Sequence, residues 1–332
     1  MNAAASPRLL ADIGGTNARF AWQEGPGAPI GDVQALPAAG YATVADAIEH
    51  YLRDLGRGVP RACSIAIANP VDGDRITMTN HHWTFSIAEL KARIGFDRLV
   101  VINDFTALAL ALPSLADDEK RQIGGGVAHP HAAIGVLGPG TGLGVSGLLY
   151  DGRGGWVPVQ GEGGHVTLPA TTAREVAVIE QLARRHGHPS AERAVCGQGL
   201  VDLHRAVVAL NQPGAPEPTL AAADITTAAL SGSDAACVEA VSLMCAFLGT
   251  VAGNLALTLG TRGGIYIGGG IVPRLGKAFD ASPFRARFEA KGRFTSFMAS
   301  VPVFVIEARR SPAFLGAASA LDAPAPVAGV SA

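Results

Sequence analysis

Two distant segments of this chain repeat one pattern, in which an apolar strand enters a glycine-rich turn and a second strand returns from it. The first segment runs from Arg8 to Gln23 and turns at Gly14-Gly15. The second runs from Ala132 to Tyr150 and turns within Gly138 to Gly144. A tight turn of this kind points successive backbone N–H groups into one concavity, which binds an anion without a basic side chain. Two such turns that face each other can hold a polyphosphate from both sides.

The sequence of these turns excludes the commoner phosphate motifs. The chain contains no G-x-x-x-x-G-K-[ST] sequence, so it has no P-loop of that type. The glycines from Gly138 to Gly144 fall on alternate positions and precede a strand, whereas the dinucleotide fingerprint opens a helix. Either cluster alone is more often a structural turn. Two clusters, with Asp12 at the end of the first strand, favour phosphate binding.

Length and charge narrow the class of protein further. The chain has 332 residues, more than one compact domain usually holds, which suggests two lobes. Its formal net charge of -2 argues against nucleic acid as a partner, because phosphate backbones demand a basic surface.

The four cysteines form no C-x-x-C pair and no zinc spacing, so we expect buried, reduced thiols in a cytoplasmic protein. The N-terminus lacks the charged start and apolar run of a signal peptide.

Hydrophobic periodicity predicts strands and helices along most of the chain. Besides the two hairpins, strands are expected at Ala62–Ala68, Arg75–Thr79, Arg98–Ile102, Gly264–Ile267 and Val301–Ile306. Helices are expected at Thr43–Asp54, Ser86–Ile94, Phe105–Leu112, Ala173–Arg185, Gly199–Leu210, Ile225–Leu230, Asp234–Leu259, after Pro273, and at Pro312–Ala320. The most apolar of them, at 234–259, contains a glutamate, an asparagine and two glycines, and is predicted to be a buried helix rather than a membrane span.

Three glycine motifs resemble those of the superfamily that contains actin, heat-shock chaperones and sugar kinases. Asp12 to Asn17 resembles its first phosphate motif, Gly138 to Gly144 its second, and Ile267 to Arg274 its adenosine motif. The segment Val305 to Ala318 resembles its second connecting element, a small-residue helix at the hinge. Within that superfamily the chain resembles the glucokinase family typical of proteobacteria. The segments that carry this closer resemblance are MTNHHWTFS from Met78, INDFTA from Ile102, GEGGHV from Gly161, SAER from Ser190 and GNLAL from Gly253.

The resemblance implies an α/β fold of two lobes, the actin-like ATPase fold related to ribonuclease H, with a cleft between the lobes. It implies a small lobe made of residues 1–113 plus about 305–322, and a large lobe of residues 114–304. The tail of residues 323–332 is rich in proline and alanine, and we expect it to be disordered. The family also suggests a homodimer.

The resemblance further implies a sugar site built from amide, carboxylate and imidazole groups, which suit the vicinal hydroxyls of a sugar. A hydroxyl that attacks a γ-phosphate needs a carboxylate to accept its proton. Asp104 matches the family's base, although an aspartate directly after a strand is otherwise commonly a helix N-cap. The implied sugar ligands are Asn103, Asp104, Glu162, His165 and Glu192.

ATP and Mg²⁺ are the implied cofactors. Asp12 is expected to orient Mg²⁺ through water, since this ion prefers oxygen ligands and dehydrates reluctantly. The implied nucleotide ligands are Asp12, Gly14, Gly15, Thr16, Asn17, Gly138, Gly140, Thr141, Gly142, Gly268, Gly269 and Gly270. Related repressors and kinases often carry a cysteine-rich zinc motif after their sugar histidine. No cysteine occurs here between Val166 and Cys196, so no structural zinc is expected.

The implied reaction is the ATP-dependent phosphorylation of glucose at its 6-hydroxyl, which gives glucose 6-phosphate and ADP and belongs to glycolysis. A kinase for another hexose, such as mannose or an N-acetylhexosamine, is the nearest alternative, and polyphosphate or ADP stays open as the donor. A sugar-sensing regulator of the same fold is a more distant alternative. It would need a DNA-reading element, for which we expect no room before the first strand at Arg8.

Overall fold

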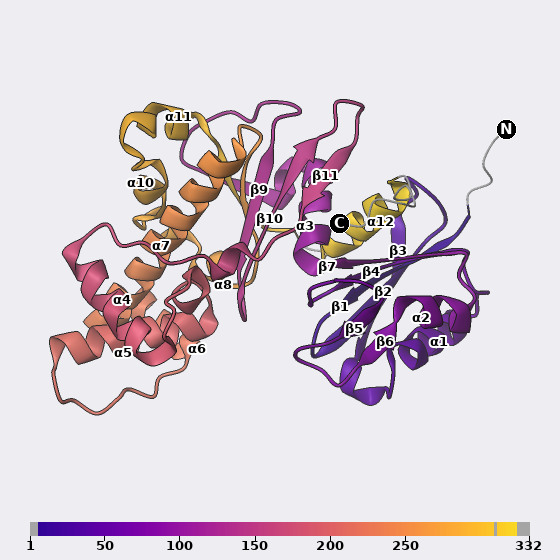
Figure 1. The fold of residues 1–332 in the computed structure, drawn as a ribbon, viewed down its shortest axis with the longest axis horizontal. Helices are drawn as coiled ribbons and strands as arrows, with labels where there is room; N and C mark the ends of the chain where they lie inside the picture. The colour runs from indigo at the N-terminus through magenta and orange to yellow at the C-terminus, as the bar shows by residue number, and fades with distance from the viewer. Residues whose placement is uncertain (1–5, 309–310, 324–332) are drawn as a thin grey trace. The chain divides into compact units, whose positions relative to one another are not determined.

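The structure of the protein is a computed structural model, which describes residues 6–308 and 311–323. These residues form two compact units (Figure 1). One unit contains the described residues up to Leu115 together with those from Ala308 onward, and the other spans Ala116–Glu307. Most of the tail expected to be disordered lies outside the described residues, as do residues 309 and 310 of the expected connecting element.

The first unit is built on a five-stranded sheet with the strand order β3-β2-β1-β4-β7. Strands β1 and β2 form the predicted antiparallel hairpin, and β4 and β7 continue the sheet parallel to β1. The bounds are β1 Arg8–Ile13, β2 Asn17–Gln23, β3 Ile30–Pro37, β4 Ala62–Ile67 and β7 Arg98–Asn103. A separate two-stranded sheet pairs β5 Arg75–Thr77 with β6 Thr84–Ser86.

Helices cover both faces of this sheet. Helices α1 (Val44–Leu55) and α2 (Ile87–Ile94) share one apolar core with β1, β2 and β4. On the opposite face, α12 (Ala313–Asp322) packs against β1 and β4 and against α3 (Asp104–Ala111). Gly316 of α12 lies directly on the backbone of Ala107, where any side chain would collide, so a glycine allows the two helices to touch.

The second unit is built on a six-stranded sheet with the order β11-β10-β9-β12-β13-β8. Strands β9 and β10 form the second predicted hairpin, and β9, β12 and β13 run parallel. The bounds are β8 Lys120–Ile123, β9 Ile134–Pro139, β10 Leu143–Tyr150, β11 Trp156–Val159, β12 Gly264–Ile267 and β13 Val303–Ile306. Because β9 and β10 extend further than the sequence predicted, only residues 140–142 remain outside the strands.

The long apolar helix α7 (Ala235–Leu259) forms the centre of the helical layer in the second unit (Figure 1). It is long and apolar enough to cross a membrane, yet 67% of its most apolar window is buried inside the protein, by helices α5, α6 and α10 among others. That burial is typical of a core helix. The surrounding helices are α4 Ala173–His186, α5 Gly197–Asn211, α6 Ala222–Ser231, α8 Ile271–Leu275, α9 Lys277–Asp280, α10 Phe284–Glu289 and α11 Thr295–Ser300.

Several elements differ from the prediction. Helix α8 begins at Ile271 rather than after Pro273, because a proline is tolerated in the first turn, where its missing N–H would have no helical partner. Sequence periodicity missed the edge strands β3, β8 and β11, the three-residue strand β6, and the helices α9, α10 and α11. Short 3-10 helices, also unpredicted, occur at Ala38–Gly40, Leu112–Ser114, Asp117–Glu119, Gly163–His165, Ala191–Arg193 and Gly292–Phe294.

Candidate active site

Predicted site residues of the first unit gather at one edge of its sheet. Strands β1, β4 and β7 are parallel and in register, with Asp12 opposite Ala66, which in turn lies opposite Ile102. Asp12 therefore lies at the same end of the sheet as Asn103, the last residue of β7. The carboxyl edge of a parallel sheet is where ligands of α/β proteins usually bind.

The side chain of Asn103 caps helix α3. Its Oδ1 accepts hydrogen bonds from the backbone N–H of Phe105 at 2.9 Å and of Thr106 at 3.3 Å. Its Nδ2 donates to the carbonyl of Asn69 at 3.2 Å. The cap of this helix is therefore Asn103 and not Asp104, the residue for which the sequence left that role open. The Asn103 side chain also donates a hydrogen bond to the Asp104 carboxylate, which ties the two residues together.

Asp104 opens helix α3 beside this cap. Its Oδ1 accepts a 2.9 Å hydrogen bond from the N–H of Phe105. Burial raises the pKa of the Asp104 carboxyl to about 6, and the negative charge of Asp12 adds to the increase, while the backbone hydrogen bond opposes it. A carboxyl group with this pKa is ionised at neutral pH and holds a proton more strongly than an ordinary aspartate.

Asp12 is held by partners from two distant parts of the chain. Its Oδ2 accepts a hydrogen bond from Ser311 Oγ at 2.9 Å and lies 3.3 Å from Nη1 of Arg19. Arg19 faces Asp12 directly across the β1–β2 hairpin. Among the described residues, no donor occupies the other carboxylate oxygen of Asp12. A half-buried carboxylate with one free oxygen suits a cation that is bound through water.

The first glycine turn closes between β1 and β2. The N–H of Gly14 donates to the carbonyl of Asn17 at 2.9 Å, and the exposed Thr16 stands at the tip. A side chain on Gly15 would meet the backbone oxygen of Asn80 at 2.9 Å. Glycine at this position therefore lets the turn lie against the segment around Asn80, part of the MTNHHWTFS motif.

The second glycine turn is tight and well supported. The N–H of Gly140 donates to the carbonyl of Gly142 at 2.8 Å, and the Gly140 carbonyl accepts from the N–H of Gly197 at 2.9 Å. Gly197 is the first residue of α5, so this helix begins against the turn. Thr141 is exposed at the tip. The N–H of Leu143 donates to Oε2 of Glu192 at 2.8 Å, which joins a predicted sugar ligand to a predicted phosphate turn.

The three predicted sugar ligands of the second unit lie on neighbouring segments. Glu162 is the N-cap of a short 3-10 helix that ends at His165, and its glycines, Gly163 and Gly164, press against Val145 and Leu143 of β10. The next residue, Val166, accepts a 2.8 Å hydrogen bond from the N–H of Ala191, the neighbour of Glu192. Glu162 and His165 are exposed and Glu192 is half-buried. The structure thus places the segments that carry these three residues next to each other, with Glu192 bonded to the glycine turn.

The third glycine motif lies against the second. The N–H of Gly268 donates to the carbonyl of Leu137 at 2.7 Å, which extends β12 alongside β9. Gly269 has a φ of +76° and lies on the backbone of Pro139, where no side chain fits. Gly270 is the N-cap of α8 and is exposed. The two motifs predicted for phosphate and adenosine are therefore neighbours.

The predicted residues form two groups, one in each unit. Asp12, the first glycine turn, Asn103 and Asp104 belong to the first unit, whereas the second and third glycine motifs and the sugar ligands Glu162, His165 and Glu192 belong to the second. The sequence analysis missed Asn69, Arg19 and Ser311. Hairpin register could have placed Arg19 opposite Asp12, but no local pattern relates Ser311 or Asn69 to their partners.

Comparison with known proteins decides the family. The family model described as Glucokinase matches residues 9–324. The chain belongs to the glucokinase family. It is 53% identical to a glucokinase of Aromatoleum aromaticum over 95% of both chains. It is also 51% identical to the bifunctional protein glk of Burkholderia pseudomallei, of whose length it spans about half, 48%.

Solved structures agree with this assignment. The crystal structure of a glucokinase from an Antarctic psychrotroph has a TM-score of 0.88 and 35% identity, and the match covers 96% of this chain and 99% of that one. A ROK family glucokinase from Streptomyces griseus was solved in complex with glucose and AMPPNP. It matches with a TM-score of 0.61 and 21% identity, over 94% of this chain and 98% of that one, which shows the shared fold. The glucokinase resemblance, the actin-like ATPase fold class and the prediction of a glucokinase enzyme are confirmed.

Proposed function

We propose that this chain transfers the γ-phosphoryl group of ATP to the 6-hydroxyl of glucose, with Asp104 as the general base. The observation that carries the proposal is the environment of Asp104, whose pKa of about 6 results mainly from burial. A general base works best when its pKa lies near the operating pH, because it is then ionised and still binds a proton well. The cap formed by Asn103 fixes the backbone that carries this carboxylate.

Binding of glucose is assigned to hydrogen bonds from five side chains. Glu162, His165 and Glu192 offer two carboxylates and an imidazole, and Asn103 offers its amide beside the Asp104 carboxylate. Asp104 completes the set by accepting a hydrogen bond from the 6-hydroxyl. We assign the two units to a small lobe of residues 1–113 plus about 305–322 and a large lobe of residues 114–304.

Binding of MgATP is assigned to the three glycine motifs and Asp12. Backbone N–H groups at the two turns, with the exposed hydroxyls of Thr16 and Thr141, suit phosphate oxygens in place of a P-loop lysine. Asp12 suits Mg²⁺ bound through water. Ser311 and Arg19 contact one oxygen of its carboxylate, and the other oxygen remains for the hydrated ion. When bound, Mg²⁺ would neutralise the negative charge that develops on the transferred phosphoryl group.

A coupled assay that scans hexoses with MgATP tests the proposal. Glucose should be phosphorylated, while fructose and N-acetylglucosamine should be left mostly untouched. If N-acetylglucosamine gives a higher kcat/KM than glucose, the substrate assignment fails and the kinase assignment survives. Replacing ATP with ADP or polyphosphate in the same assay tests the donor, and omission of Mg²⁺ should abolish turnover.

The setting of the enzyme is also a proposal. All four cysteines are buried and unpaired, which suits a reducing cytoplasm, and we assign the enzyme to glycolysis there. We assign it a homodimeric state on its family membership, with no nucleic acid or membrane as partner. Light scattering coupled to gel filtration would measure the subunit number, and a mass of one subunit would contradict the dimer.

A further inference from the structure

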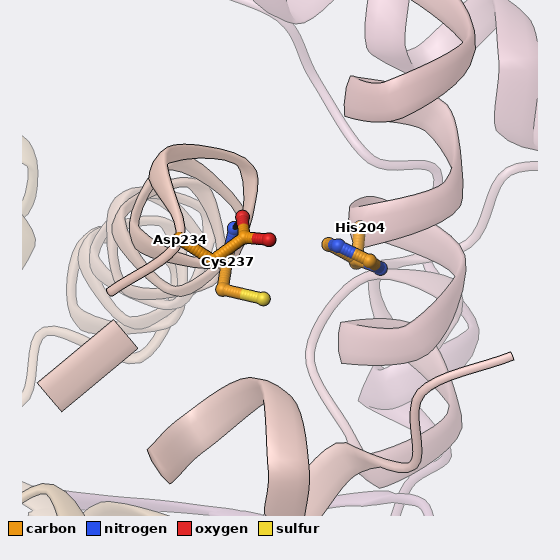
Figure 2. Close-up of side chains that lie close together, drawn as sticks. All are labelled: His204, Asp234 and Cys237. Atoms are coloured by element: carbon orange, nitrogen blue, oxygen red, sulfur yellow. Dashed lines mark hydrogen bonds between the residues drawn. The ribbon is translucent and has the colours of Figure 1, made fainter. Parts of the chain in front are cut away.

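A second cluster of chemically reactive side chains lies inside the second unit and is not used by the proposed reaction. His204 comes from α5, and Asp234 and Cys237 come from the first turn of α7. Figure 2 shows the carboxylate of Asp234 and the sulfur of Cys237 turned toward the imidazole ring of His204. One nitrogen, one oxygen and the sulfur all lie within 4.8 Å of one another.

His204 is a buried histidine with an unused nitrogen. The residue is only 3% exposed, and its Nδ1 has no hydrogen-bond partner among the described residues. A buried polar atom without a protein partner is costly and rare in native proteins, and such atoms commonly bind an ion or an ordered water.

The other two side chains offer complementary ligand atoms. Cys237 is completely buried, whereas Asp234 is partly exposed. Asp234 caps α7 through Oδ1, which accepts a 2.9 Å hydrogen bond from the N–H of Cys237. That bond fixes the side chain beside the sulfur, and the carboxylate also accepts a hydrogen bond from the Cys237 thiol. Loss of the thiol proton on metal binding would leave the carboxylate oxygen to the metal.

We propose that His204, Asp234 and Cys237 form a binding site for a thiophilic divalent cation of the Zn²⁺ class. Sulfur, imidazole nitrogen and a single carboxylate oxygen are zinc ligands, whereas Mg²⁺ prefers oxygen alone. On binding, the Cys237 thiol releases its proton to solvent and its thiolate bonds to the metal. The exposed side of Asp234 leaves a fourth, tetrahedral position open to water.

The geometry requires a small closure. In a tetrahedral zinc site with bond lengths of about 2.0–2.3 Å, ligand atoms lie about 3.3–3.8 Å apart. The side chains must therefore approach one another by about 1 Å, which rotation about side-chain bonds provides. The bound ion would fasten α5 to the start of α7. Since the N–H of Gly197, the first residue of α5, supports the Gly140 turn, a metal bound at His204 in the middle of this helix would also stiffen the support of that turn.

Cobalt titration of the full-length, reduced and chelator-treated protein without Mg²⁺ tests the site. Co²⁺ replaces Zn²⁺ in such sites and gives a thiolate-to-metal absorption band in the near ultraviolet only when a cysteine sulfur binds it. We expect the wild-type protein to develop this band with one equivalent of Co²⁺ and to lose it when Zn²⁺ is added. Zn²⁺ alone should raise the melting temperature of the wild-type protein, because a ligand that binds only the folded state stabilises it.

Matched variants identify the ligands. Cys237→Ser should abolish the band, whereas Cys245→Ser, two turns further along the same helix and also buried, should keep it. Asp234→Asn retains a capping oxygen at an exposed position and so should fold, yet it should weaken Co²⁺ binding by roughly 10–100-fold, at least the effect of losing an outer-shell partner. Absence of the band in the wild-type protein, its persistence in Cys237→Ser, or unchanged affinity in Asp234→Asn would each overturn the proposal.

Discussion

The backbone N–H of Leu143 donates a 2.8 Å hydrogen bond to Oε2 of Glu192. Leu143 is the first residue of β10, directly after the second glycine turn, and Glu192 is a proposed sugar ligand. Any side chain on Gly142 would overlap the same carboxylate. The turn that we assign to phosphate binding therefore fixes the position of Glu192. A substitution in this turn should in consequence change the affinity for glucose.

Gly142→Ala should weaken glucose binding because its methyl group displaces the Glu192 carboxylate. A hydrogen bond to a charged partner is worth about 1.5–3 kcal/mol, so the Kd for glucose should rise by roughly 10–100-fold. Gly140→Ala is the matched control, since its methyl group would meet no atom within 4 Å. Calorimetric titration of glucose into both variants measures the effect. Equal glucose affinity in the two variants would show that Glu192 does not bind the sugar.

Gly140→Val tests the phosphate turn itself. Gly140 lies in open space and its φ is not in the left-handed region, so the variant should fold with a melting temperature close to that of the wild-type protein. Added bulk at the tip should hinder phosphate approach, and the Kd for ATP should rise by roughly tenfold or more. A folded variant with unchanged ATP affinity would remove this hairpin from the nucleotide site.

Prediction from the sequence succeeded where local pattern determines structure. The β1–β2 hairpin, strand β12 and the long helix α7 follow from runs of apolar residues bounded by glycine or by a capping residue, and α7 matches its expected end at Leu259. The roles predicted for the glycine motifs and for the residues around Asp104 rest on the resemblance of these segments to glucokinase-family motifs. Each of these features depends on neighbours within a few residues.

Contacts between distant residues could not be predicted in this way. Ser311 bonds to Asp12 although 299 positions separate them, and nothing near Ser311 marks that contact. His204 and Cys237 meet only because α5 packs on α7, so counting cysteine spacings overlooked the cluster. The short helices between Lys277 and Ser300 were missed because single turns carry too few residues to show a period.

Glu162→Gln and His165→Ala should weaken glucose binding much more than ATP binding. Both side chains are exposed, so neither substitution should disturb the core, and the short 3-10 helix that carries them is held by glycine contacts with β10. We expect the Kd for glucose to rise by roughly tenfold or more in each variant, with ATP affinity within a factor of about two. Wild-type glucose affinity in both variants would contradict their assignment as sugar ligands.

Asp104→Asn should stabilise the protein at high pH. The folded pKa of about 6 exceeds the ordinary value of 3.8, so wild-type stability declines as pH rises from about 4 through 6, where the buried carboxyl must ionise. Removing the charge should recover up to about 3 kcal/mol at pH 8 and nothing below pH 4. Melting curves across this range measure the difference.

The control for this prediction has the opposite sign. Hydrogen bonds from the Ser86 side chain and the Ala88 N–H hold the pKa of Asp74 below its ordinary value. Asp74→Asn should therefore lower the melting temperature at neutral pH and have less effect as the pH falls through the range where Asp74 gains a proton. A stabilisation of Asp104→Asn that does not change with pH would show that the buried charge is not its cause.

Asp104→Asn should also reduce catalysis while leaving binding largely intact. The substitution preserves the shape and the oxygen that accepts from the Phe105 N–H, but removes the proton acceptor, so kcat should fall by roughly 10²–10⁴-fold. In the wild-type enzyme kcat/KM should decline below pH of about 6 as Asp104 gains a proton, and this decline should be absent from the residual activity of the variant. Glucose should bind at most several-fold more weakly, since Asn103 and Glu192 remain, and MgATP affinity should be unchanged. Near-normal kcat combined with a large loss of glucose affinity would make Asp104 a ligand only, and circular dichroism of the variant confirms that the comparison concerns folded protein.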